Sequence, residues 1–327
     1  MPDQTAPLQR LTVVYNPTKV EDLEAVQSVV ADACARHGWE APTWVATTES
    51  ETGEAQARAA VESGADVVGS LGGDGTVRAV ATALVGTDVS LGLLPGGTGN
   101  LLARNLGLPV DSMEEAAEAM LGGSERRIDV GMVRLGEASA APEEVFLVMA
   151  GLGLDGEIMA GTNEKIKGAL GWPAYVIAAT KNLAKRGFSV TVRSSGGDGV
   201  AGQPGGEVQR HARTVIVGNC GTLQGGIDLM PDARLDDGRL DVVVLAPQGL
   251  AGWVSVMADV VTRHRQGHSR LDRVTGAEIT VTAQQPVEAE IDGDPVGPHR
   301  ELVARVLGQA LTVRVSDGER AARSVDA

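Results

Sequence analysis

The sequence predicts an α/β domain at the amino terminus, followed by a β-rich domain. Two observations lead to this fold class. In the first third of the 327 residues, short apolar runs alternate with segments whose apolar residues recur at helical spacing, which is typical of strand–helix–strand units on a parallel sheet. After about residue 130, strand-like runs dominate and are separated by turns rich in Pro, Gly and Asp, which is typical of an antiparallel sandwich or barrel.

The expected elements of the first part follow in a regular order. Short runs rich in Val and Leu predict buried strands at 11–15, 43–46, 66–70 and 91–94. Apolar residues spaced three and four apart predict helices at 21–37 and 53–63, and a third helix that ends at Leu84. Gly38 directly follows the first helix and is a plausible stop, because glycine readily adopts the left-handed conformation that ends helices.

Strand-like runs dominate the second part. The runs lie at 145–149, 189–192, 214–217, 240–245, 278–281, 287–291, 302–306 and 311–315. A Gly-rich insertion at 194–207 interrupts them. Its Gly-Gly-Asp-Gly lacks both a preceding buried strand and a following helix, so we expect no ligand there. We place the domains at 1–132 and 133–308, with 309–327 as a final strand and tail that can return to the first domain.

Composition excludes several classes of protein. With 43% hydrophobic residues the chain can bury substantial cores, and the two cysteines, Cys34 and Cys220, lie too far apart in sequence for a metal-binding motif. No secretory signal or membrane-spanning stretch is recognised, so we expect a cytoplasmic protein. A net charge of −15 argues against a nucleic-acid partner. The sequence carries no signal for an oligomeric state.

Two glycine-rich loops are the strongest functional signal. Residues 72–76 read GGDGT and follow a predicted buried strand, and residues 95–100 read PGGTGN one strand later. Glycines let backbone amides approach phosphate oxygens, and parallel sheets bind ligands at the carboxyl ends of their strands. Neither loop is a P-loop or a dinucleotide fingerprint. We expect Asp74 on an exposed loop, where it meets a magnesium ion carried by a nucleotide.

Six motifs occur in one order along the chain. They are Asn16-Pro17, GGDGT at 72–76, LLPGGTGN at 93–100, GLGLDGE at 151–157, PDARLDDG at 231–238 and IDGDP at 291–295. In this order they resemble the diacylglycerol-kinase catalytic-domain family, which includes bacterial lipid kinases and sphingosine kinases, and the likeness runs from about residue 10 to about 316. It implies a phosphofructokinase-like α/β domain, a β-rich sandwich domain, and Mg-ATP bound in the cleft between them to phosphorylate a lipid hydroxyl.

The resemblance also implies the site residues. The ATP site would contain Asn16, Thr48, Gly72, Gly73, Asp74, Gly75, Thr76, Gly97, Thr98 and Asn100. The position given to Thr48 is also open to Thr47. Asp294 would be the catalytic base and Asp74 the second catalytic carboxylate. A structural Mg²⁺ would be held by the side chain of Asp237 and by the carbonyls of Arg234 and Arg239, although Asp-Gly is equally a plain hairpin turn.

Three positions depart from the family pattern. Asp294 stands where bacterial relatives have Glu, so the carboxylate reaches one methylene less far. Arg78-Ala79-Val80 replaces Asn-Glu-Val, and Asn100-Leu101 replaces Asn-Asp, and each change removes a carboxylate near the expected phosphates. Two alternatives therefore stay open. One is a NAD or sugar kinase with a similar GGDG loop, and the other is a lipid-binding regulator with impaired catalysis.

The segment 164–188 is the candidate for membrane contact. It combines an apolar series with Lys165, Lys167, Lys181, Lys185 and Arg186 against the single acidic Glu164. A basic amphipathic helix with an aromatic residue suits a membrane surface, and an ordinary helix packed on the β-rich domain is the alternative. Two readings of this segment therefore stay open: peripheral contact with the inner membrane face, and internal packing on the β-rich domain.

Overall fold

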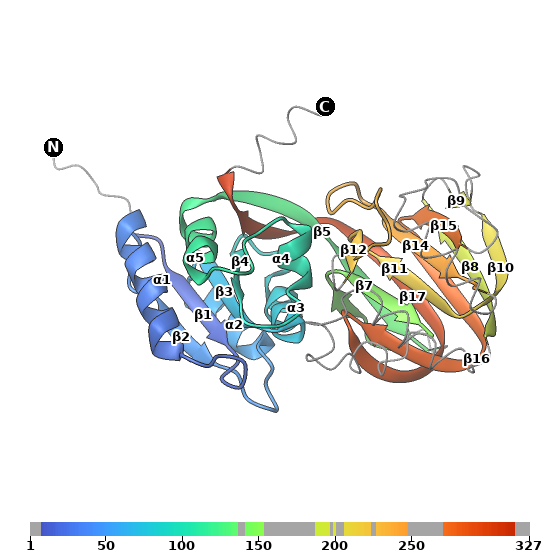
Figure 1. Ribbon diagram of the computed structural model, residues 1–327, viewed down its shortest axis with the longest axis horizontal. Coiled ribbons are helices and arrows are strands. Elements are labelled where there is room, and N and C mark those ends of the chain that lie inside the picture. The colour runs from blue at the N-terminus through green and yellow to red at the C-terminus, as the bar shows by residue number, and fades with distance from the viewer. Residues whose placement is uncertain are drawn as a thin grey trace, which may run out of the picture. The chain divides into compact units, whose positions relative to one another are not determined.

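The computed structural model describes residues 8–136, 141–153, 187–196, 199–200, 206–223, 227–247 and 271–317 (Figure 1). The chain divides into two compact units. The first contains Met1–Ile128 and Gln309–Ala327, and the second contains Asp129–Gly308. Each boundary falls inside a strand, since β5 spans Ser124–Leu135 and β17 spans Asp294–Val315. Within the described residues, no helix is both long and apolar enough to cross a bilayer.

A parallel sheet forms the centre of the first unit. Its strands are β2 (Thr43–Ala46), β1 (Leu11–Tyr15), β3 (Val67–Gly72) and β4 (Ser90–Pro95), hydrogen-bonded in that order. The end of β17 continues the sheet, because Val313 pairs in parallel with Leu91. Strand β3 is buried along its whole length, as expected for a central strand covered on both faces.

Helices cover both faces of this sheet (Figure 1). They are α1 (Leu23–His37), α2 (Glu54–Glu62), α3 (Asp74–Leu84), the short α4 (Leu101–Asn105) and α5 (Met113–Gly122). Helices α1 and α5 pack together over one face, where Leu11 and Val13 point. Helices α2 and α3 pack together over the other. Gly38 ends α1 in the left-handed conformation, at the residue that the sequence predicts as a stop.

Antiparallel strands build the second unit. They are β6 (Glu144–Phe146), β7 (Met149–Leu152), β8 (Phe188–Ser195), β9 (Gly199–Val200), β10 (Glu207–Ala212), β11 (Thr214–Gly218), β14 (Leu240–Leu245), β15 (Leu271–Gly276) and β16 (Glu278–Ile291). One path runs β17-β16-β7-β11-β14-β15-β9, while β8 pairs β16 and β10. Two-residue strands β12 (Thr222–Leu223) and β13 (Ile227–Asp228) form a separate hairpin. Valines dominate the core that these strands enclose. The predicted fold class, an α/β unit with a β-rich sandwich unit, is confirmed.

Several strands are longer than the sequence pattern predicts. The runs at 278–281 and 287–291 belong to one strand, β16, whose register is irregular between Thr282 and Val287. The runs at 302–306 and 311–315 both lie on β17, in which Gln309 takes a positive φ of 49° instead of opening a turn. Polar residues interrupt the apolar alternation in both strands, so the local pattern suggests turns where the sheet continues.

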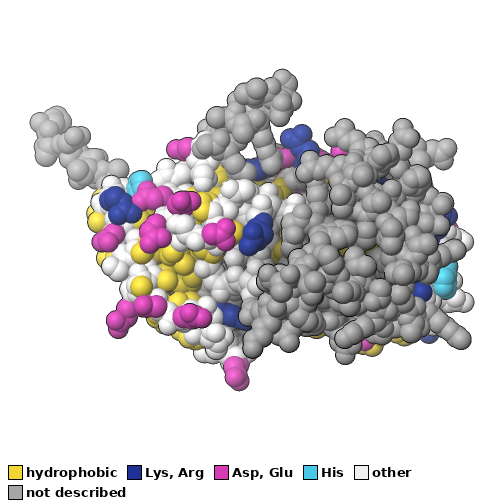
Figure 2. Space-filling view, viewed as in Figure 1, with side chains coloured by type: hydrophobic (Ala, Val, Ile, Leu, Met, Phe, Trp, Pro, Cys, Tyr) yellow, Lys and Arg dark blue, Asp and Glu magenta, His cyan; other side chains and the backbone are white. Residues whose placement is uncertain are grey.

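The surface agrees with the acidic composition. On the face shown in Figure 2, Asp and Glu side chains are spread over the first unit, with fewer Lys and Arg among them. Exposed carboxylates of the first unit pair with arginines, for example Glu118 with Arg36 and Glu54 with Arg58. Such exposed pairs contribute little to stability, so the net charge chiefly affects solubility and the choice of partner.

Candidate functional site

The predicted nucleotide-binding residues follow the carboxyl ends of adjacent strands. In the sheet order β2-β1-β3-β4 these ends carry Thr48, Asn16, Gly72 and Pro95. Gly72 lies opposite Pro95 in the register, and the amide of Asn16 donates to the carbonyl of Leu71 at 2.9 Å. The parallel sheet therefore places these loops along one edge, where open α/β sheets bind ligands.

The two glycine loops pack backbone against backbone. A Cβ atom on Gly96 would lie 2.7 Å from the amide nitrogen of Gly72, and one on Gly97 would lie 2.7 Å from the Cα of Gly73. Gly72 itself faces the side chain of the buried Thr76, which a Cβ would meet at 2.7 Å. Glycine is therefore required at these positions for the loops to approach, quite apart from any ligand.

Asp74 joins one loop to the other. Its Oδ1 accepts a hydrogen bond of 2.6 Å from the backbone amide of Leu101, the first residue of α4. A Cβ on Gly99 would stand 2.2 Å from Oδ2, so the second loop also closes over the other oxygen. Asp74 is half-buried, and the expectation of a freely exposed loop residue is wrong because the carboxylate receives this amide from the second loop.

Asn100 stabilises the second loop from within. It has a left-handed φ of 47°, and its side chain forms both hydrogen bonds with Gly97, accepting from the amide at 3.3 Å and donating to the carbonyl at 2.9 Å. Arg104, which the sequence did not single out, donates from Nε to the carbonyl of Gly99 at 3.0 Å. A helical Arg near a glycine loop is too common a pattern to have revealed this contact. These bonds pre-form the loop, and a role for Asn100 at ATP stays a prediction.

The remaining predicted ATP-site residues differ in exposure. Asn16 accepts from the amide and the hydroxyl of Thr18 through its Oδ1. Thr47 is buried, and its amide donates to the carbonyl of Tyr15 at 2.8 Å. Thr48 and Thr98 are exposed, and Thr48 Oγ1 accepts from the amide of Glu51 in a local turn. Exposure favours Thr48 over Thr47 as the residue able to contact a ligand.

A tight hairpin in the second unit carries Asp294. Ile291 pairs with Asp294 around Asp292 and Gly293, whose φ angles of 49° and 88° are both positive, as a type I′ turn requires. Asp294 is exposed at the start of β17. An exposed carboxylate at a hairpin end is accessible to a substrate, and this is what its predicted role as base demands.

The buried carboxylate of Asp292 anchors this hairpin. It accepts hydrogen bonds from the amides of Leu147 at 2.9 Å, Val148 at 2.8 Å and Met149 at 3.0 Å. The amide of Asp292 in turn donates to the carbonyl of Met149 at 2.8 Å. Three amides on one carboxylate form a strong set of charge-assisted bonds, so Asp292 holds the turn while Asp294 remains accessible.

Glu290 is a functional candidate that sequence reasoning missed. It is 1% exposed, and within the described part of the chain neither carboxylate oxygen has a hydrogen-bond partner. Burial, together with the nearby charges of Asp292 and Asp294, raises the pKa of Glu290 to about 7. In the sequence both Glu290 and the exposed Glu288 stand between two apolar residues, so no local signal separates the two.

The predicted magnesium turn is rich in carboxylates. Asp237 Oδ1 accepts from the amide of Arg239 at 3.1 Å, and Asp129 Oδ2 accepts from the amide of Gly238 at 2.7 Å. Burial, with a contribution from the charge of Asp129, raises the pKa of Asp237. Burial and the charges of Asp237 and Asp232 raise the pKa of Asp241 to about 7. This concentration of negative charge fits a divalent cation with oxygen ligands.

The same turn does not form a cage of side chains. Within the described ranges, no group of three or more His, Cys, Asp or Glu side chains is arranged to hold a metal ion. The predicted set needs only the side chain of Asp237, with the carbonyls of Arg234 and Arg239 and water completing it. That composition suits Mg²⁺, which keeps several waters. The metal role of these residues stays a prediction.

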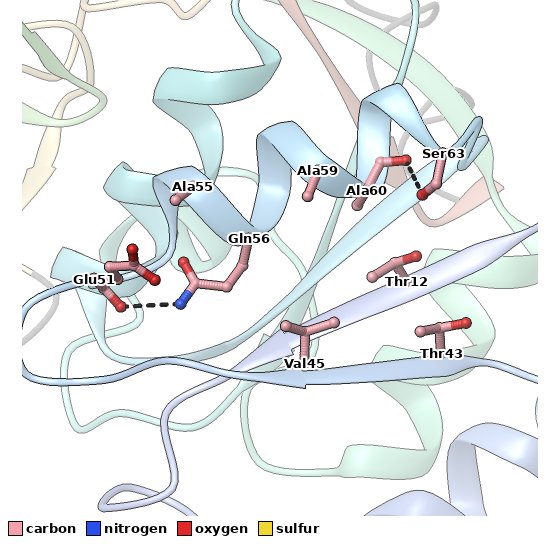
Figure 3. A pocket seen from close by; sticks show the side chains of 9 residues that line it. All are labelled: Thr12, Thr43, Val45, Glu51, Ala55, Gln56, Ala59, Ala60 and Ser63. Atoms are coloured by element: carbon pink, nitrogen blue, oxygen red, sulfur yellow. Dashed lines mark hydrogen bonds between the residues drawn. The ribbon is translucent and has the colours of Figure 1, made fainter.

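A cavity of about 350 Å³ lies beneath α2 in the first unit (Figure 3). It is bounded by α2 and by β1 and β2, with Gln56, Thr12 and Thr43 among its lining residues. Gln56 donates to the carbonyls of Glu51 and Ala46, while its Oε1 has no partner in the described structure. None of the predicted ATP-site residues lines this cavity, so we do not place the nucleotide there.

Two family descriptions match the chain. The diacylglycerol kinase catalytic domain matches residues 10–133, and the YegS C-terminal NAD kinase beta sandwich-like domain matches residues 148–315. The first match contains both glycine loops, and the second contains the carboxylate turn at Asp237 and the hairpin at Asp294. The two matches therefore cover all the motifs that suggested the family.

Individual relatives extend over most of the chain. A diacylglycerol kinase of Bacillus subtilis is 26% identical over 291 residues, which make up 88% of this chain and 90% of that protein. A "probable lipid kinase YegS-like" of Pseudomonas putida is 31% identical over 282 residues, or 84% of each chain. A solved structure of a diacylglycerol kinase from Bacillus anthracis shares the fold, with a TM-score of 0.71 at 20% identity, covering 96% of this chain and 99% of that one.

Proposed function

The chain belongs to the diacylglycerol-kinase catalytic-domain family, and on that premise we propose that it is an ATP-dependent kinase phosphorylating a hydroxyl of diacylglycerol or a similar membrane lipid. Membership confirms the resemblance that the ordered motifs indicate. The observation that carries the proposal is the hydrogen bond by which Asp74 joins the two glycine loops at the carboxyl edge of the sheet.

The first unit supplies the groups for ATP. Backbone amides at the start of α3 and along the second glycine loop suit phosphate oxygens, because helix amino termini and glycine-rich turns present N–H groups to anions. Thr48 and Thr98 add exposed hydroxyls along the same edge. The close contact of the loops forms this surface without a ligand, and such preorganisation lowers the cost of binding.

The second unit supplies the base. The lipid hydroxyl oxygen attacks the γ-phosphorus of ATP, the bond between that phosphorus and the β–γ bridging oxygen breaks, and ADP leaves. The hydroxyl proton passes to the carboxylate of Asp294, which the anchored hairpin presents to the surface. A Glu in this turn, as in the family, would reach about one methylene further. With Asp294 as the base, the lipid hydroxyl must therefore come closer to the turn.

Magnesium has two proposed places. Mg²⁺ bound with ATP would neutralise charge on the phosphates. Asp74 is the candidate carboxylate for this ion, because it is part of the first glycine loop. A second Mg²⁺ would be held by Asp237 and the carbonyls of Arg234 and Arg239. Burial that raises the pKa of Asp237 makes a cation partner favourable there.

The test is a labelling experiment. Purified protein is incubated with Mg²⁺ and γ-labelled ATP, with either total membrane lipid or diacylglycerol in mixed micelles, and the labelled product is identified by chromatography and mass spectrometry. We expect a phosphorylated lipid. The Asp74→Asn variant should lose this activity, whereas Asp88→Asn should not, because the Asp88 carboxylate is fully exposed and pairs with Arg127 at 3.6 Å at the surface.

Parallel reactions separate the alternatives. NAD in place of lipid should remain unlabelled, and label on NAD would contradict lipid specificity. An absence of labelled lipid under all conditions, with ATP binding retained in a calorimetric titration, would instead identify a lipid-binding regulator without catalysis. The departures at Arg78 and Leu101 from the family pattern make this second outcome worth measuring.

Membrane contact is a separate part of the proposal. The basic segment 164–188 lies, except for Gly187 and Phe188, outside the described residues, and its role rests on its sequence alone. Replacing Lys181, Lys185 and Arg186 with Glu should weaken sedimentation with anionic vesicles, because each basic residue near such a surface contributes roughly 1 kcal/mol. Unchanged sedimentation would show that the segment does not bind the membrane.

A further inference from the structure

Glu290 occupies an unusual position on β16. Its neighbours in sequence, Ala289 and Ile291, point into the core of the second unit, so Glu290 points to the opposite face of the strand. Across the sheet it lies beside Gly151 of β7 and Pro295 of β17. It is 1% exposed, and no hydrogen-bond partner for its carboxyl oxygens occurs in the described structure.

The surroundings of Glu290 favour its uncharged form. An ionised carboxylate is costly to bury without a partner. Among the described residues, the charged groups that act on it are acidic, namely Asp292 in the turn that follows β16 and Asp294 on β17. Strand β7 beside it, Met149–Leu152, carries no charged side chain, and Glu288, two residues earlier on β16, is exposed. No described cation offsets a negative charge at this position.

Ionisation of Glu290 would act on the anchor of the hairpin. Asp292 is two residues further along the chain, in the turn after β16, and its carboxylate holds that turn through the amides of Leu147, Val148 and Met149. A negative charge on Glu290 would repel that carboxylate at close range. Like charges at such a distance are unfavourable, and more so when they are buried. The same turn presents Asp294, the proposed base.

We propose that Glu290 is a positioning residue for phosphoryl transfer, which keeps the hairpin of Asp292 and Asp294 in its working geometry only while its own carboxyl group is uncharged. This inference rests on the proposed kinase function. Because burial raises the pKa of Glu290 to about 7, the active geometry should be lost as the pH rises above neutral.

The first test compares pH–rate profiles. Lipid phosphorylation by the unmodified protein and by Glu290→Gln is measured between about pH 6 and about pH 8.5. Gln has the shape of the uncharged acid and does not ionise, so the two rates should agree near pH 6. By about pH 8 the variant should be roughly tenfold faster, since a group titrating near 7 is then about ten-elevenths ionised. A rate ratio that is constant with pH would overturn the proposal.

Glu288→Gln is the matched control. Glu288 is on the same strand and face, two residues away, but it is exposed, so its variant should keep a constant rate ratio to the unmodified protein. If that ratio rises as steeply as the ratio for Glu290→Gln, the effect comes from general charge on the strand, and the proposal fails.

A second measurement needs no activity. Amide hydrogen exchange of Val148 and Met149, which donate to Asp292, is followed with pH in the unmodified protein and in Glu290→Gln. We expect exchange in the unmodified protein to accelerate above neutral pH relative to the variant. Equal exchange at all pH values would overturn the proposal. If no lipid is labelled at any pH, the kinase function fails, whereas the exchange result still decides whether Glu290 controls the hairpin.

Discussion

The carboxylate of Asp74 accepts a 2.6 Å hydrogen bond from the backbone amide of Leu101. This bond connects the amino terminus of α3 to that of α4, and so connects the two glycine loops. Asp74 therefore has a structural role besides its proposed role at Mg-ATP. The two roles can be separated by the choice of substitution, because Asn keeps an acceptor oxygen and Ala does not.

We predict different results for Asp74→Asn and Asp74→Ala. Both should nearly abolish lipid phosphorylation, because both remove the charge that would meet Mg-ATP. Only Ala should lower the free energy of unfolding, by about 1–3 kcal/mol, because it leaves the amide of Leu101 without an acceptor. Urea unfolding and initial rates of both variants provide the measurement. Wild-type activity in Asp74→Asn would disprove the nucleotide role.

At position 294, Asp294→Asn should reduce turnover by about 10²–10⁴-fold without loss of ATP binding, because it removes the proton acceptor. Asp294→Glu should retain activity and can raise it through the longer side chain. The measurement is the initial rate at saturating Mg-ATP and lipid in mixed micelles. Asp294 is exposed, so Asp294→Glu, which keeps the charge, should leave the unfolding midpoint unchanged. Should Asn turn over as fast as Asp, the base is another residue, with Asp74 as the first candidate.

Magnesium should stabilise the folded protein through Asp237. Thermal unfolding without nucleotide is recorded with and without Mg²⁺, and saturation at about 100 times the dissociation constant adds roughly 2.7 kcal/mol. Asp237→Asn should abolish this gain. The adjacent Asp236, which pairs with Arg234 at 3.4 Å, provides the control, since Asp236→Asn should keep it. A gain that survives in Asp237→Asn would place the ion elsewhere.

Arg314 should be essential for the stability of the first unit. Its guanidinium donates to three carbonyls at the carboxyl end of α5, those of Met120, Leu121 and Gly123, and its side chain is only 11% exposed. Arg314→Met should therefore cost about 3 kcal/mol, since it leaves partly buried helix-end carbonyls without donors.

The control for this prediction is Arg58→Met. Arg58 forms an exposed pair with Glu54 one helical turn away, and such pairs contribute only about 0.3–0.5 kcal/mol. Denaturant unfolding of both variants gives the comparison. Equal losses in the two variants would contradict a structural role for the contacts between Arg314 and α5.

Stability should depend on pH through Glu290. Its pKa is raised from 4.5 unfolded to about 7 folded, so the folded state holds the proton more tightly. The resulting stabilisation is fully present below about pH 4.5 and is lost as the pH rises through about 7, a loss on the order of 3 kcal/mol. Glu290→Gln should lack this loss.

Urea unfolding at about pH 5 and about pH 8 provides the measurement. The free energy of unfolding of the variant, relative to that of the unmodified protein, should be larger at the higher pH. A difference between the two proteins that does not change with pH would contradict the assignment.

Local patterns in the sequence determined the fold class and the glycine loops. Buried strands in parallel sheets are continuous apolar runs, and helices repeat their apolar residues every three to four positions, so both can be recognised without knowing their neighbours. The glycines at 72, 96 and 97 are recognisable for a similar reason, because they lie within three residues of the ends of the predicted strands 66–70 and 91–94. Ordered motifs then indicated the family.

Contacts between distant residues were decided only by the tertiary structure. The hydrogen-bonded partners lie far apart in the chain: 27 residues separate Asp74 from Leu101, 144 separate Asp292 from Val148, and 194 separate Arg314 from Met120. The local sequence around one partner does not indicate the other. Glu288 and Glu290 occupy equivalent places in one alternating run, yet one is exposed and the other is 1% exposed. Burial of a charged residue depends on what covers it, and that is a property of the assembled fold and not of the strand.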